Sequence, residues 1–105
     1  MTEQMEVRCF ELISTAGDAR SSYIEAVQAA GEGNFEEAER LMEQGRLAFS
    51  KGHEVHADML TVEANGKSET CLLLIHAEDQ MMSAESFGIL AEQFIDLYRR
   101  LQDKQ

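Results

Sequence analysis

The chain has 105 residues, the length of one domain, and its hydrophobic content of 44% argues against a disordered protein. It contains no proline, and residues that favour helices dominate it, which predicts a single all-α domain over residues 1–105. The formal net charge of −11 argues against nucleic acid or an anionic membrane as a partner, because both require a basic surface.

The sequence also indicates the cellular compartment of the protein. No run approaches the roughly 20 apolar residues of a membrane-spanning helix, and the stretch from Met1 to Glu6 is polar and acidic, unlike a signal peptide. Cys9 and Cys71 fall on apolar faces without the spacing of a zinc site or a redox motif. We therefore expect a cytoplasmic protein with no direct membrane binding and with two buried, reduced thiols.

The first predicted helix spans residues 2–30, with Thr2 as its N-terminal cap. Apolar and small residues follow an unbroken spacing of three and four along it: Met5, Cys9, Leu12, Ala16, Ala19, Tyr23, Ala26 and Ala30. Ala16, Gly17 and Ala19 form a narrow waist at which another backbone could approach closely. The Gly-Glu-Gly sequence that follows is expected to end the helix.

The second predicted helix spans residues 34–64. Asn34 and Glu37 have the spacing of an N-terminal capping box. Gly45 and Gly52 are seven residues apart and therefore share one face of the helix. We expect both glycines to be positions of close approach rather than breaks in the helix.

Two histidines of this helix, His53 and His56, are three residues apart and could share a metal ion. No third ligand stands at a fixed spacing from them, so the zinc signal is weak. We expect partly exposed helix residues, with His56 near the edge of the core.

The third predicted helix spans residues 68–102, after an Asn65-Gly66 turn and with Ser68 as its cap. One continuous stripe, expected to face the core, consists of Leu73, Ala77, Gln80, Ala84, Phe87, Ala91, Phe94, Tyr98 and Leu101. A second stripe, about a quarter-turn away, consists of Leu72, His76, Asp79, Ser83, Leu90 and Leu97. A surface helix needs only one buried face, so the second stripe predicts a second packing partner.

Three long helices joined by short turns predict an antiparallel, up-down-up three-helix bundle. Each helix keeps a nearly strict repeat of 3.5 residues, which favours a left-handed supercoil. A domain of this size buries only a modest share of its surface, so assembly with other copies would add stability.

The second stripe of the third helix holds the residues best suited to chemistry. His76 lies one turn inside the helix on a mostly apolar flank, where a neutral imidazole is a nucleophile whose protonation is easily tuned. The pattern alone also suits a histidine held in an interface. Asp79 and Gln80 follow at i+3 and i+4, so a carboxylate could orient the ring and an amide could donate to a bound anion.

Three segments of the chain resemble the enzyme IIA component of the lactose/cellobiose/chitobiose branch of the bacterial sugar phosphotransferase system. Leu74–Met82, with the sequence LIHAEDQMM, is similar to the family's His-Ala/Gly-Gln-Asp-His-Leu-Met phosphorylation segment. Gly17–Ser21 is similar to the family's Gly-Asp/Gln-Ala-Arg-Ser. Gly33-Asn34-Phe35, followed by Ala38, matches a Gly-Asp-Phe and Ala pattern, and the resemblance covers nearly the whole chain in order and spacing.

The resemblance implies a phosphotransferase component that carries phosphohistidine. His76 would accept a phosphoryl group from the phosphorylated form of the carrier protein HPr and pass it to a cysteine of the IIB component during uptake of a β-linked disaccharide. Gln80 would donate a hydrogen bond to the phosphoryl group. The family fold is a homotrimer of nine helices, in which Asp79 and its two symmetry mates would surround a structural Mg²⁺ or another divalent cation at the trimer axis.

Three positions depart from the family pattern. Glu78 and His56 stand where the family has glutamine, and Gln80 stands where it has histidine. Glu78 is expected to add a negative charge near the phosphoryl group. Two other classes compete with the relay: a two-component histidine phosphotransfer domain, disfavoured because Asp79 stands where such domains have lysine, and a non-catalytic trimeric adaptor or metal-binding bundle in which His76 is simply buried.

Overall fold

The computed structural model describes residues 1–66 and 71–104, and these residues form three α-helices. They are α1 (Glu3–Gly31), α2 (Phe35–Ala64) and α3 (Leu72–Asp103). The all-α prediction is confirmed, and the bounds of α1 and α2 lie within one residue of the predicted ones. The predicted cap Ser68 lies outside the described residues, and α3 begins at Leu72.

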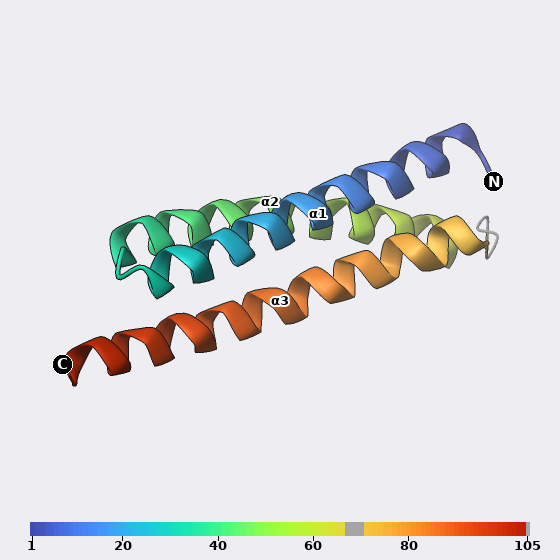
Figure 1. Cartoon of the computed structure of the whole chain (residues 1–105). Helices are drawn as coiled ribbons and strands as arrows, with labels where there is room; N and C mark the ends of the chain where they lie inside the picture. The colour runs from blue at the N-terminus through green and yellow to red at the C-terminus, as the bar shows by residue number, and fades with distance from the viewer. Residues whose placement is uncertain (67–70, 105) are drawn as a thin grey trace.

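The three helices lie side by side in a rod of 58 × 18 × 16 Å, and consecutive helices run in opposite directions (Figure 1). The first helix, α1, packs along both of the others, whereas α2 and α3 contact each other much less. Within residues 1–66 and 71–104, this arrangement leaves one long flank of α3 without a neighbour. Among the described residues, no helix has the length and apolar character to cross a membrane.

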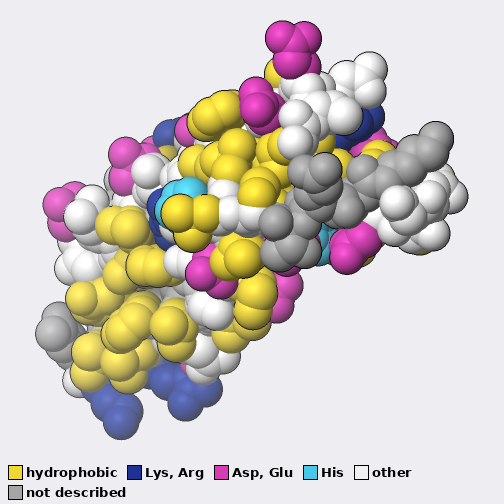
Figure 2. Space-filling view, turned by 90° about the vertical axis from the view of Figure 1, so that its right-hand side faces the viewer, with side chains coloured by type: hydrophobic (Ala, Val, Ile, Leu, Met, Phe, Trp, Pro, Cys, Tyr) yellow, Lys and Arg dark blue, Asp and Glu magenta, His cyan; other side chains and the backbone are white. Residues whose placement is uncertain are grey.

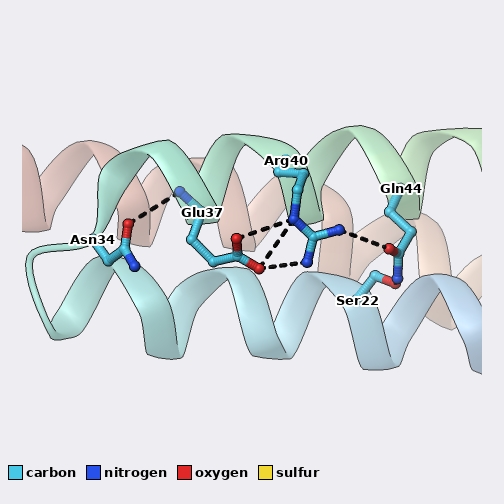
Figure 3. A network of polar contacts seen from close by, with 5 residues as sticks. All are labelled: Ser22, Asn34, Glu37, Arg40 and Gln44. Atoms are coloured by element: carbon cyan, nitrogen blue, oxygen red, sulfur yellow. Dashed lines mark hydrogen bonds and ion pairs between the residues drawn. The ribbon is translucent and has the colours of Figure 1, made fainter.

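Side-chain caps and a polar network fix the turn between α1 and α2. Asn34 accepts a hydrogen bond from the backbone N–H of Glu37 at 3.2 Å, which confirms Asn34 as the cap of α2. The other half of the predicted capping box does not form, because the backbone N–H of Asn34 donates to the carbonyl of Ala29 instead of to Glu37. The Glu37 carboxylate pairs with Arg40, and this hydrogen bond lowers the pKa of Glu37 (Figure 3). Arg40 also donates to Gln44, whose amide donates to Ser22 of α1 at 3.0 Å, so the network joins the two helices.

The ring of Tyr23 occupies the centre of the bundle between two glycines. A Cβ built at Gly45 of α2 would lie 2.5 Å from the ring, and one at Gly88 of α3 would lie 2.9 Å from it. A Cβ at Gly52 would lie 2.7 Å from Thr15, so the predicted close approaches at Gly45 and Gly52 are confirmed. Burial in this position raises the pKa of the Tyr23 phenol.

Gly17 is different from these glycines. None of the described atoms, outside the helix's own neighbouring backbone, lies within 4 Å of a Cβ built at Gly17. Among the described residues, the predicted waist at Ala16, Gly17 and Ala19 therefore meets no second backbone at Gly17, although both alanines are buried.

We expect Gly45→Ala to destabilise the fold. The new methyl group would push the Tyr23 ring out of its place, at a cost of about 1–3 kcal/mol. The gain in helix propensity offsets about 1 kcal/mol of this cost. Thermal unfolding followed by circular dichroism tests the prediction, and a higher midpoint than that of the wild type would show that the ring does not rest against α2.

The buried face of α3 differs from the predicted one. Ala77, Ala84 and Ala91 are buried as expected, but Met81 and Ile95 complete the core. The predicted core positions that are instead exposed are Phe87, Phe94, Tyr98 and Leu101. The physical reason is the Tyr23 ring, which needs Gly88 opposite it and so turns the large neighbouring side chains of α3 toward the flank.

The two cysteines are both free thiols in different surroundings. Cys9 is fully buried in the core, and burial raises its pKa. Cys71 precedes α3 and is half-buried. The prediction of two buried thiols is therefore confirmed for Cys9 and wrong for Cys71, which stands at the end of the bundle rather than in its core.

Candidate functional site

The unpartnered flank of α3 is strongly apolar. Leu72, Leu90 and Leu97 of the predicted second stripe are 82%, 55% and 51% exposed. We define the α3 flank as that stripe with the exposed side chains beside it: Leu72, His76, Asp79, Ser83, Phe87, Leu90, Phe94, Leu97 and Leu101. Figure 2 shows hydrophobic side chains gathered over the lower part of the molecule, where α3 lies.

An apolar groove runs between this flank and α1. It has a volume of about 220 Å³ and its lining includes Tyr23, Ile24, Phe87, Leu90 and Phe94. Monomeric soluble proteins rarely expose a continuous apolar surface of this kind unless a partner covers it. The α3 flank and the groove therefore form an exposed apolar surface of the kind that a partner commonly covers.

His76 is exposed near the beginning of α3, on the α3 flank. The described part of one chain therefore does not bury the imidazole, and in the trimeric adaptor alternative other copies would have to bury it. An exposed ring beside apolar side chains such as Leu72 can be reached by another protein and can act as a nucleophile.

A contact between α1 and α3 brings two of the three family-like segments together. The guanidinium of Arg20 donates from Nη1 to Oε1 of Gln80 at 2.5 Å, although the two residues are 60 positions apart. Gln80 lies one helical turn after His76, on the same side of α3. The third segment forms the α1–α2 turn, at the other end of the bundle from the start of α3 (Figure 1).

Glu78 does not lie where the sequence led us to expect. Its carboxylate contacts Nε2 of His56 on α2 at 3.2 Å. Residues two apart on a helix point about 200° away from each other, so Glu78 and His76 face opposite sides of α3. Within one chain the Glu78 carboxylate therefore points toward α2 rather than toward His76, and two of the departures from the family pattern contact each other.

The structure keeps the other candidate ligands apart. Asp79 is exposed on the α3 flank, whereas His56 contacts Glu78 and the ring of His53 lies 6.4 Å from that of Phe49. Within the described part of the chain, no group of three His, Cys, Asp or Glu side chains could hold a metal ion. His53 and His56 thus belong to no such group among the described residues, and Asp79 lies apart from them on α3.

Comparisons with known proteins identify the family. The family model described as "PTS system, Lactose/Cellobiose specific IIA subunit" matches residues 7–99. The lichenan-specific phosphotransferase enzyme IIA component of Bacillus subtilis is 35% identical over 100% of this chain and 96% of its own length. The lactose-specific EIIA component of Staphylococcus epidermidis is 30% identical, over 93% of this chain and 95% of its own length.

Two solved structures resemble the fold closely. The cellobiose-specific enzyme IIA of Bacillus anthracis has a TM-score of 0.95 and 38% identity, over 100% of this chain and 97% of that one. The IIA(chitobiose) chain from a complex with HPr of Escherichia coli has a TM-score of 0.84 and 30% identity, over 96% of this chain and 99% of that one. The chain therefore belongs to the lactose/cellobiose-specific IIA family of the phosphotransferase system, whose members are phosphotransferase carriers.

Proposed function

We propose that the protein is a cytoplasmic phosphocarrier that accepts a phosphoryl group from phospho-HPr on His76 and passes it to a cysteine of a IIB component. The observation that carries this proposal is the position of His76, exposed and one turn from the Arg20–Gln80 contact. A neighbouring structure that holds IIA(chitobiose) with HPr supports HPr as the donor. Relatives named for lichenan and lactose support uptake of a β-linked sugar.

The proposed chemistry needs only one nucleophilic nitrogen. The lone pair of a neutral His76 imidazole attacks phosphorus in line, a new N–P bond forms, and the N–P bond of phospho-HPr breaks with its electron pair returning to the donor imidazole. No proton has to move, provided that each ring keeps its N–H on the other nitrogen. In the next step a cysteine thiolate of IIB attacks phosphorus, and His76 leaves as a neutral imidazole.

The protein's contribution to this step is mainly orientation. Holding acceptor and donor in line supplies much of the rate of a phosphoryl transfer. Ile75 and Met82, both exposed and within two turns of His76, would make an apolar docking surface for HPr and IIB and keep water from the phosphohistidine. Gln80 would donate to a phosphoryl oxygen through its amide nitrogen.

We further propose a homotrimer of nine helices, in which the apolar side chains of three α3 flanks pack together and His76 lies where other copies cover it only in part, so that HPr and IIB still reach it. The exposed leucines and phenylalanines of this flank support it, because burying them against two copies would remove a large apolar surface from water. The left-handed supercoil of the bundle remains part of this proposal.

The trimer would bring three Asp79 carboxylates to one axis. Such carboxylates repel one another, and each chain would contribute the carboxylate oxygens of its exposed Asp79, which are ligands of the kind that Mg²⁺ prefers. The residues therefore fit a divalent cation shared by three copies. When bound, Mg²⁺ or another divalent cation would supply positive charge for packing, away from the phosphoryl chemistry.

We expect Asp79→Leu to abolish binding of the cation and to leave the trimer intact, since three leucines can fill an apolar axis without charge. After dialysis against Mg²⁺, the wild type should hold about one ion per three chains and Asp79→Leu should hold none. Asp96→Leu is the matched control, because Asp96 is an exposed aspartate of α3 that pairs with Arg100. Retention of the cation by Asp79→Leu would contradict the axial site.

Incorporation of acid-labile phosphate tests the function as a whole. The wild type is incubated with phosphoenolpyruvate, enzyme I and HPr, and we expect about one phosphate per chain, stable in base and lost in acid. Omitting HPr should prevent labelling. A protein that takes no label from the complete system, or takes the same label without HPr, would not be a carrier of this kind.

A further inference from the structure

We propose that Arg20 binds the phosphoryl group once it is attached to His76. This inference rests on the proposed function, in which His76 is the acceptor. Arg20 belongs to α1, the helix that packs against α3, and its guanidinium would supply positive charge beside the phosphorylated histidine.

The first argument is position. Arg20 is half-buried, and its guanidinium reaches across the α1–α3 contact to Oε1 of Gln80. Gln80 follows His76 by four residues, and side chains at this spacing are neighbours, with Cβ atoms about 6 Å apart. The guanidinium therefore lies beside the space that a phosphoryl group on His76 would occupy.

The second argument is charge. A phosphoryl group adds between one and two negative charges, and the chain already carries a formal charge of −11. Four other arginines pair with carboxylates in the structure, and they are Arg40, Arg46, Arg99 and Arg100. The hydrogen-bond partner of Arg20 is instead a neutral amide, so this contact leaves its positive charge uncompensated.

The third argument is geometry. A guanidinium has five N–H donors in a planar fork that matches two phosphoryl oxygens, and the contact with Gln80 uses one of them. The same contact occupies the amide oxygen of Gln80, which leaves its NH₂ group to donate in turn. Arg20 and Gln80 together would therefore present several donors to the phosphoryl group and none of the acceptors that would repel it.

The phosphorylation equilibrium with HPr tests this role. Arg20→Gln should still be labelled on His76, but the equilibrium constant for transfer from phospho-HPr should fall about 10- to 100-fold, the effect of losing a charge-assisted hydrogen bond. Arg20→Lys keeps the charge and loses the planar fork of donors, so its equilibrium constant should lie between those of the wild type and Arg20→Gln. The matched control is Arg8→Gln, which removes an equal charge from α1 three turns earlier and should leave the equilibrium unchanged.

A second measurement needs no substitution. In the ¹⁵N-labelled wild type, the guanidinium resonances of Arg20 should shift when the protein is phosphorylated, and those of Arg8 should not. Equal equilibria for Arg20→Gln and Arg8→Gln, or guanidinium resonances of Arg20 that do not move, would overturn the inference. A wild type that takes no phosphate from HPr would overturn the proposed function instead, so the two failures are distinct.

Discussion

Replacing His76 with glutamine is expected to abolish phosphoryl acceptance from phospho-HPr. The glutamine side chain keeps a polar group on the same exposed flank, but its amide nitrogen has no free electron pair with which to attack phosphorus. Because His76 is exposed, the free energy of unfolding should change by less than about 0.5 kcal/mol. Labelling with ³²P through the complete relay measures the effect, and circular dichroism checks the fold.

The matched control is His53→Gln on α2. His53 is also an exposed histidine on a helix, but it lies on α2 near Phe49 rather than on the α3 flank. This variant should accept phosphate at the rate of the wild type. Full labelling of His76→Gln, or loss of labelling in His53→Gln, would show that the phosphorylated residue is not His76.

Replacing Leu90 with aspartate is expected to break the homotrimer. Leu90 lines the apolar groove with Ile24 and Phe94, and assembly would place its side chain among other copies. Burying an unpaired carboxylate there costs about 3 kcal/mol or more per subunit, which is roughly a 100-fold loss of affinity. Sedimentation equilibrium should show a trimer for the wild type and a monomer for Leu90→Asp at micromolar concentration.

Leu47→Asp serves as the control for this experiment. Leu47 is a leucine of α2 that is 64% exposed and lies outside the α3 flank. The same change of side chain should leave the trimer intact. A trimeric Leu90→Asp, or a monomeric Leu47→Asp, would show that the subunits associate through a different surface.

The periodicity of the sequence predicted the three helices and their turns, but it did not predict how α3 is rotated. Apolar residues occupy two adjacent stripes of α3, and both stripes satisfy a helical repeat. The choice between them depends on the ring of Tyr23, which fits against Gly88 and so leaves Phe87 and Phe94 on the flank. A contact between residues so far apart in the chain leaves no trace in the local pattern.

The candidate site, too, could be predicted only where its residues are close together in the sequence. His76, Asp79 and Gln80 could be singled out because they stand on one stripe or one short segment. The contact of Arg20 with Gln80 depends on the packing of α1 against α3, so the sequence pointed to Arg20 only as part of a family-like segment. The direction of the Glu78 side chain, in contrast, follows from local geometry alone. A residue two positions after His76 faces the other side of the helix.

Mapping the phosphorylated residue tests the central claim most directly. The wild type would be phosphorylated through enzyme I and HPr, digested at neutral pH and examined by mass spectrometry with fragmentation that preserves phosphohistidine. We expect the phosphate on His76. Phosphate on His53, on His56 or on a cysteine, with none on His76, would contradict the account.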